Sequence, residues 1–225
     1  MTQSTFNPSR RSQLTRRDLG RFTGSSLFDH VARVVCEAEC LPRKELYESW
    51  EFARRVRRRF RGSRIVDLAC GHGLVAHLML LLDDSSSGAL AVDTQLPPSA
   101  HTLTRALVAA WPRLAKRIDL LQAPIAEVPL HAHDIVVSVH ACGLLTDTVL
   151  ARAVSANARV AVLPCCHNEA TCDLGGLGGW VDAPLAIDLT RAARLRQQGY
   201  QVATQTIPAA ITPKNRLLLG NPLGS

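Results

Sequence analysis

The segment that decides the fold is Arg64-Ile-Val-Asp-Leu-Ala-Cys-Gly-His-Gly73, in the first third of a 225-residue chain. An apolar run leads into Asp67, and Gly71 and Gly73 follow before a second apolar stretch at residues 74–82. Glycine permits a tight turn at the carboxyl end of a strand and lets a ligand approach the backbone closely. The segment therefore predicts a strand, a ligand-binding loop and a helix, in that order.

Alternation of strands and helices continues to the end of the chain. We expect strands at residues 64–68, 89–92, 118–122, 134–139, 160–163, 202–207 and 217–220, and helices at 73–82, 99–115, 144–153 and 187–198. Helices between strands indicate right-handed βαβ units and a parallel sheet. Only residues 208–213 separate the last two strands, which should form an antiparallel hairpin. The predicted fold class is α/β, with a seven-stranded, mostly parallel sheet.

A carboxylate also ends the second strand. Asp93 follows Gly73 by twenty residues and is placed to accept the ribose hydroxyls of a nucleoside. A dinucleotide-binding loop would have a third glycine at the position of Ala76. Asp67, four residues before Gly71, would repel a diphosphate and suits a cation. The pattern favours a positively charged nucleoside ligand.

The D-x-x-C-G-x-G pattern of residues 67–73 resembles motif I of the class I S-adenosylmethionine-dependent methyltransferases. Their fold is a Rossmann-like seven-stranded sheet that ends in an antiparallel hairpin, as expected above. The resemblance implies an enzyme that uses S-adenosylmethionine, with the cofactor-binding residues Asp67, Cys70, Gly71, Gly73, Asp93, His140 and Cys142. The rival interpretation is a non-catalytic nucleotide- or RNA-binding module that kept the fold.

Three further stretches narrow the resemblance: Val139-His-Ala-Cys-Gly-Leu-Leu-Thr-Asp147, Val162-Leu-Pro-Cys-Cys-His167 and Thr212-Pro-Lys-Asn-Arg216. They are similar to segments of the tRNA acceptor-stem ribose methyltransferases and of the methyltransferase-like proteins that contain a glutathione-S-transferase C-terminal domain. The resemblance covers residues 44–221. Asn168 departs from it, because the related enzymes have a second histidine there, and no zinc-finger segment precedes the domain.

Methyl transfer needs alignment of nucleophile, methyl group and sulfur, and a hydroxyl or amine nucleophile must also lose a proton. A neutral histidine can accept that proton. We expect His167 to be the catalytic base, with His140 as the second candidate, and either could instead only hydrogen-bond the loops. Cys166, Lys214 and Asn215 are candidate substrate-binding residues.

Seven cysteines show no framework spacing and are expected to be free thiols of a reducing cytoplasm. Cys165 and Cys166 are adjacent, and Cys172 follows them, which is not the C-x2-C spacing of structural zinc sites. From this spacing we expect no metal, and we interpret these residues as thiols beside the active site.

The net charge of +7 is concentrated at the front of the chain. Residues 1–64 contain 15 Lys and Arg against seven Asp and Glu. Residues 1–24 are expected to form a mobile basic arm, and residues 25–63 a helical extension of the methyltransferase domain that runs to residue 225. The second helix of this extension has an arginine-rich face, from which Arg54 and Arg58 are predicted to bind substrate. A basic front suggests RNA, such as tRNA, as the partner; a solvated face, or a small-molecule or protein substrate, is the alternative.

Hydrophobic residues make up 47% of the chain and charged residues 20%, which excludes wholesale disorder. No apolar run approaches the ~20 residues that span a bilayer, and the start lacks the apolar core of a secretion signal. These features predict a cytoplasmic protein with no membrane partner.

Overall fold

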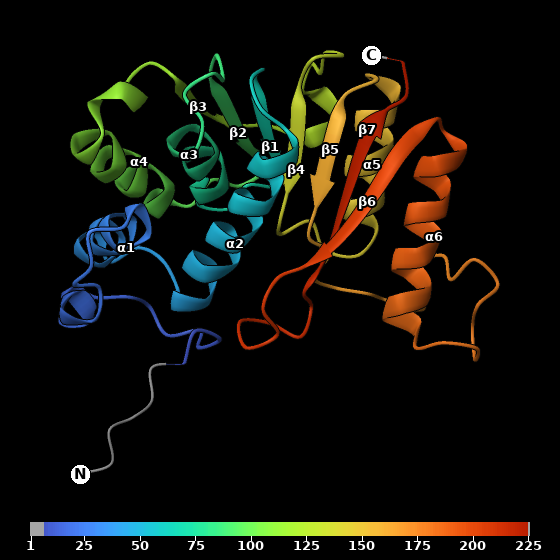
Figure 1. The fold of residues 1–225 in the computed structure, drawn as a ribbon, viewed down its shortest axis with the longest axis horizontal. Helices are drawn as coiled ribbons and strands as arrows, with labels where there is room; N and C mark the ends of the chain where they lie inside the picture. The colour runs from blue at the N-terminus through green and yellow to red at the C-terminus, as the bar shows by residue number, and fades with distance from the viewer. Residues whose placement is uncertain (1–6, 225) are drawn as a thin grey trace, which may run out of the picture.

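The computed structural model describes residues 7–224 and contains one sheet with helices on both faces (Figure 1). Its strand order is β3-β2-β1-β4-β5-β7-β6, and the bounds are β1 Ile65–Leu68, β2 Ala89–Asp93, β3 Ile118–Gln122, β4 Ile135–Ser138, β5 Arg159–Val162, β6 Tyr200–Thr206 and β7 Arg216–Pro222. Strands β1 to β5 pair in parallel, whereas β7 is antiparallel to both β5 and β6. The expected fold, including its terminal hairpin, is confirmed.

Within the described residues, six α-helices connect or precede these strands: α1 Leu27–Ala38, α2 Arg43–Arg59, α3 Leu74–Leu81, α4 Pro98–Ala110, α5 Leu144–Ser155 and α6 Ala183–Gln197. Capping side chains fix two of these starts, because the Ser26 side chain accepts the Asp29 N–H at α1 and the Asp182 side chain accepts the Leu185 N–H at α6. The predicted helix 99–115 is shorter than expected: α4 ends at Ala110, and Pro112 starts a separate 3₁₀ turn.

Side-chain alternation along the strands separates two cores. Ile135 and Val137 of β4 belong to a core shared with α1 to α4, while Val136 belongs to a second core shared with α5 and α6. Strand β1 is buried on both faces. This is the pattern of a central parallel strand covered on each side by helices, and it places the carboxyl ends of β1 and β4 next to each other.

The predicted mobile arm is wrong for the part that the structure describes, residues 7–24; residues 1–6 lie outside the described residues. Leu14 is buried and pairs its N–H with the Leu41 carbonyl, and the Arg43 N–H donates to the Ser12 carbonyl. A 3₁₀ helix, η1, follows at Arg16–Arg21 and packs on α1. Apolar burial of Leu14 and Phe22 holds this segment on the domain.

Within residues 7–224, the structure contains no helix with both the length and the apolar character needed to cross a membrane.

Candidate active site at the carboxyl edge of the sheet

The glycine loop after β1 has the open backbone that the sequence predicted. Gly71 and Gly73 both adopt positive φ angles, +56° and +76°. A Cβ atom at Gly71 would meet no described atom within 4 Å, whereas one at Gly73 would touch Ala91 and Leu120 at 3.4 Å. Gly71 thus faces open space that a ligand can enter, and Gly73 allows the loop to pack on the sheet.

Asp93 lies directly beside this loop. Its Oδ2 accepts the Gly71 N–H at 2.9 Å, and its Oδ1 accepts the Gln95 N–H at 3.2 Å. An ionised carboxylate has about four acceptor positions, so two backbone bonds hold it in place and leave capacity for ribose hydroxyls. Asp93 is half-buried, so part of its carboxylate is accessible to a ligand.

Asp67 and Cys70 differ from Gly71 and Asp93 in that their side chains are buried and do not face the open space beside the loop. The Asp67 side chain accepts the Ala76 N–H at 3.3 Å, and burial raises its pKa to about 8, with further increases from the negative charges of Asp93 and Glu45. Burial likewise raises the pKa of the Cys70 thiol. Cys70 packs in the core shared with α1 to α4, so its sulfur supports the loop from inside.

His72, between the two glycines, connects the loop to the N-terminal helices. Its Nδ1 lies 2.9 Å from Glu45 Oε1 at the start of α2. A cleft of about 580 Å³ adjoins it, lined among others by Arg11, Cys40 and Thr102. This volume is in the range of small-molecule sites. Neither Glu45 nor Arg11 carried a sequence signal for the site, because both reach it only through the packing of the front on the sheet.

The segment after β4 provides the next group of candidates. Gly143 has a φ of +58°, and a Cβ there would meet no described atom within 4 Å. His140 is half-buried, and its Nε2 is enclosed without a hydrogen-bond partner among residues 7–224. Cys142 is exposed. An open glycine on each of two neighbouring strand ends, with Asp93 beside one and an unpartnered histidine nitrogen beside the other, fits a nucleoside cofactor that bridges them.

His167 is held in a different way. Its side chain is only 2% exposed, and its Nε2 donates to Asp188 Oδ1 on α6 at 2.8 Å. Arg216 donates to the other oxygen of Asp188 at 2.7 Å. Burial pushes the pKa of Asp188 up, but the hydrogen bonds from His167 and Arg216 outweigh it and hold the pKa below its ordinary value. The Nδ1 of His167, like the Nε2 of His140, is enclosed without a hydrogen-bond partner among residues 7–224, so the geometry leaves both histidines as candidates for the base.

A buried arginine continues this network toward β4. Arg191 is 1% exposed, donates to both carboxylate oxygens of Asp147 at 3.1 and 2.7 Å, and donates to the Gly143 carbonyl at 2.9 Å. Asp147 ends the sequence motif quoted above, but its partner lies 44 residues further along the chain. The sequence motif therefore contained Asp147, but no motif indicated Arg191 as its partner.

The predicted substrate-binding residues fall into three groups. Cys166 is exposed at the carboxyl edge, beside Cys165. Lys214 and Asn215 precede β7 at the same edge, where Asn215 closes the hairpin by donating from its side chain to the Ile207 carbonyl. Arg54 is paired with Glu51 at 3.1 Å. Arg58 is exposed, but it belongs to the end of α2 that lies away from this edge.

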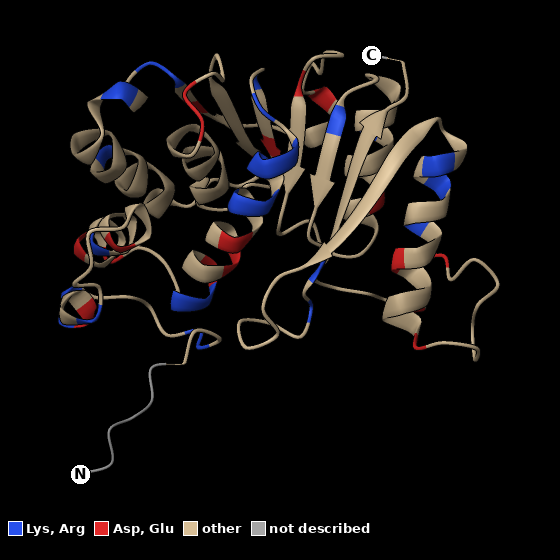
Figure 2. Ribbon diagram, viewed as in Figure 1, with Lys and Arg blue, Asp and Glu red and all other residues tan. Residues whose placement is uncertain are grey.

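The arginine-rich face of α2 is thus not uniform. Arg57 is buried, donates to the Met79 carbonyl and pairs with Asp83 at 3.1 Å, and burial lowers its pKa to about 10. Glu45 contacts the glycine loop, whereas the Arg61 carbonyl accepts a bond from Arg159 at the start of β5. The upper end of α2 in Figure 2 therefore lies at the amino edge of the sheet, about 20 Å along the helix from Glu45.

Comparison with known proteins agrees with this geometry. A family model described as a methyltransferase domain matches residues 43–173, more than half of the chain. None of the curated proteins matches the sequence significantly.

Solved structures that share the fold have low sequence identity. An O-methyltransferase family protein from Burkholderia thailandensis is 16% identical, with a TM-score of 0.51 over 93% of this chain and 68% of that one. The m1A22 tRNA methyltransferase TrmK of B. subtilis is 15% identical, with a TM-score of 0.51 over 77% and 66%. The S-adenosylmethionine-dependent methyltransferase SibL is 19% identical, with a TM-score of 0.51 over 94% and 66%. The chain belongs to the methyltransferase-domain family and is an S-adenosylmethionine-dependent methyltransferase.

Proposed function

We propose that the enzyme transfers the methyl group of S-adenosylmethionine to a structured RNA, with tRNA as the first substrate to test. The cofactor supplies a methyl group that its sulfonium already activates, so the protein has to align the acceptor and remove its proton. The proposed roles are ribose binding by Asp93, close backbone approach at Gly71 and Gly143, and proton acceptance by His140.

The observation that carries the RNA proposal is a group of unpaired arginines in residues 10–17, one of which lines the cleft beside the glycine loop. Arg10, Arg11, Arg16 and Arg17 are exposed, and their side chains have no acidic partner among residues 7–224. Arg11 lines the same cleft as His72. Lys214 adds a further positive charge at the carboxyl edge. A polyanion that enters the site would meet these groups first.

The structure supplies a matched control for this proposal. Arg58, Arg59 and Arg61 are also exposed arginines, but they lie at the amino edge of the sheet (Figure 2). Three substitutions, Arg11→Gln, Arg16→Gln and Arg17→Gln, form the test variant, and Arg58→Gln, Arg59→Gln and Arg61→Gln form the control, so each variant loses three positive charges. An RNA that contacts Arg58 while it reacts at His140 would have to extend across both edges.

The experiment measures binding of bulk tRNA at several salt concentrations, and transfer of labelled methyl groups to the RNA, protein and metabolite fractions of the host. We expect label in RNA, a steep loss of affinity with salt, and a smaller salt slope in the test variant than in the control. Equal slopes in both variants would refute the proposed binding surface. Label confined to protein or metabolites would refute the RNA substrate.

A small-molecule acceptor is the second candidate, and a specific cleft favours it. A mainly apolar cleft of about 400 Å³ lies between α6 and the β6–β7 hairpin, lined by Pro164, Leu185 and Leu189 and bordered by Asp188 and Arg216. Pro164 lies two residues after the end of β5, so the cleft adjoins the candidate active site. Under this alternative, label would appear in the metabolite fraction and a Leu189→Arg substitution would abolish it.

A further inference from the structure

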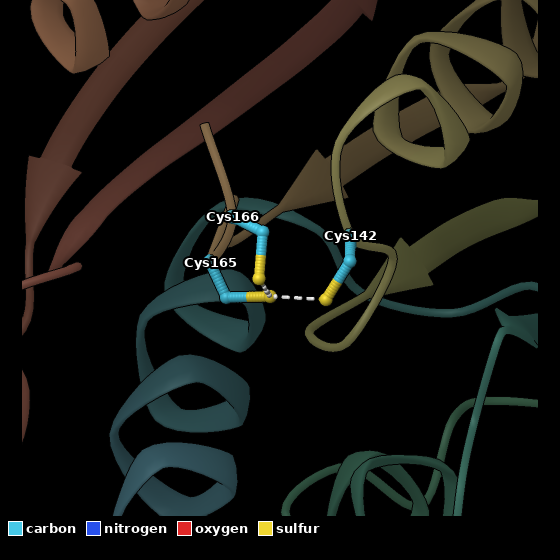
Figure 3. A group of neighbouring side chains, drawn as sticks. All are labelled: Cys142, Cys165 and Cys166. Carbon is cyan, nitrogen blue, oxygen red and sulfur yellow. Dashed lines mark hydrogen bonds between the residues drawn. The ribbon is translucent and has the colours of Figure 1, made fainter. Parts of the chain in front are cut away.

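Three cysteine sulfur atoms converge at the carboxyl edge, from two different loops. The Sγ atom of Cys142 lies 3.0 Å from that of Cys165, which lies 3.7 Å from that of Cys166, and all three are within 4.8 Å of one another. Figure 3 shows the three side chains pointing toward one another. We refer to Cys142, Cys165 and Cys166 as the thiol cluster.

The backbone holds the two loops of the thiol cluster together. The Gly143 N–H donates to the Cys166 carbonyl at 3.0 Å, so the segment after β4 and the segment after β5 are joined directly beside the sulfur atoms. The Arg191 bond to the Gly143 carbonyl fixes the same point from α6. The convergence of the sulfur atoms is therefore built into the framework of the edge.

The separations suit one shared ion. A thiophilic ion such as Zn²⁺ binds sulfur at about 2.3 Å in tetrahedral geometry, which puts neighbouring sulfur atoms about 3.8 Å apart. The Cys165–Cys166 separation already has this value, and Cys142 needs to move by less than about 1 Å. None of the described Lys or Arg side chains hydrogen-bonds to these three sulfur atoms, so the protein offers no other cation to balance a thiolate there.

We propose that the thiol cluster binds a single thiophilic divalent cation, Zn²⁺ in the first instance, through three cysteine thiolates. Binding replaces three thiol protons by three metal–sulfur bonds and releases the protons to solvent, with no change of oxidation state. Cys142 and Cys166 are exposed, so the fourth coordination position faces solvent. Three protein ligands with one open position are the arrangement of reactive zinc sites, whereas structural sites are closed by four.

The spacing of the cysteines along the chain did not predict this metal site. Cys165 and Cys166 are adjacent, and the third ligand comes from 23 residues earlier, on another strand end. Cys172, the nearest cysteine in the sequence on the C-terminal side, is buried and is contacted by Arg191 instead. The site does not depend on whether RNA is the substrate.

The test uses the reduced full-length protein with Zn²⁺ and, separately, Co²⁺. Competition against a chromophoric chelator measures Zn²⁺ stoichiometry and affinity, and Co²⁺ reports thiolate ligands through its sulfur-to-metal charge-transfer absorption. Cys142→Ser is the test variant, and Cys40→Ser, which removes a half-buried thiol that does not belong to the cluster, is the control. Circular dichroism checks that both variants fold, as the exposure of Cys142 leads us to expect.

We expect one equivalent of Zn²⁺ and a charge-transfer band in the wild type and in Cys40→Ser. In Cys142→Ser we expect at least 100-fold weaker binding and a reduced band. Unchanged binding in Cys142→Ser, or a wild-type Co²⁺ spectrum without the band, would overturn the proposal. So would a Cys142–Cys165 disulfide, detected by mass spectrometry without reductant, that forms even when Zn²⁺ is present.

Discussion

Replacement of Asp67 by asparagine should stabilise the protein, and by an amount that grows with pH. Asp67 is 1% exposed in β1, and its contact with a described donor is the Ala76 N–H. Burial raises its pKa from 3.8 to about 8. The folded protein therefore favours the protonated carboxyl, while the unfolded chain loses the proton near pH 4. Asparagine has nearly the same shape and can still accept the Ala76 N–H.

The magnitude follows from linkage. A carboxyl whose pKa is raised by folding contributes nothing unfavourable below pH 4, and its cost increases as pH rises toward the folded pKa of about 8. Between pH 5 and pH 8 each pH unit costs about 1.4 kcal/mol, so the wild type should lose about 4 kcal/mol relative to Asp67→Asn over that interval. All other titrating groups are common to both proteins and cancel in the difference.

Urea unfolding at pH 5, 6.5 and 8 measures this difference. Asp119→Asn, at an exposed carboxylate of β3, is the control, because water solvates its charge in both the folded and the unfolded chain. The reasoning would be refuted by an Asp67→Asn difference that stays constant within about 1 kcal/mol across the three pH values, or one that shrinks as pH rises.

Three substitutions test the site itself. Gly71→Ala should cost about 1–2 kcal/mol of stability because of its positive φ, and it should weaken S-adenosylmethionine binding at least tenfold by calorimetry. The control Gly199→Ala, at φ +79° and also open, should cost the same stability with unchanged affinity; equal affinities in the two variants would contradict the loop assignment. His167→Gln should destabilise the protein by about 1.5–3 kcal/mol through loss of its buried bond to Asp188. His140→Gln should instead lower methyl transfer with little loss of stability, and the reverse pattern would return the base to His167.

The sheet and its glycine loop were predictable because their determinants are local. The run from Arg64 to Gly73 contains the strand, the turn glycines and the start of α3, and the structure agrees within one residue at each end of β1. The hairpin was equally local, since too few residues separate β6 from β7 for a crossover helix.

The front of the chain was not predictable in the same way. Residues 7–24 lack helical periodicity, and what holds them is the pairing of Leu14 with Leu41, which no window of sequence displays. The net charge of this region also does not show which arginines are exposed and which are buried. Arg57 and Arg58 are neighbours in sequence, yet one is buried against Asp83 and the other is exposed at the amino edge.

The strand-end loops show why site chemistry needed the tertiary structure. His167 and Gly143 both belong to motifs that the sequence displays, but the residues that hold them lie far away in the chain. Asp188, which bonds to His167, is 21 residues away, and Arg191, which bonds to Gly143, is 48 residues away. A buried guanidinium is costly unless it is paired, and Arg191 is paired with Asp147 and with a loop carbonyl rather than with solvent. Arg191 thereby holds Gly143, which follows Cys142 in the chain and whose N–H donates to the Cys166 carbonyl of the thiol cluster. Loss of Arg191 should therefore disturb methyl transfer and Zn²⁺ binding together, although neither ligand is expected to touch it.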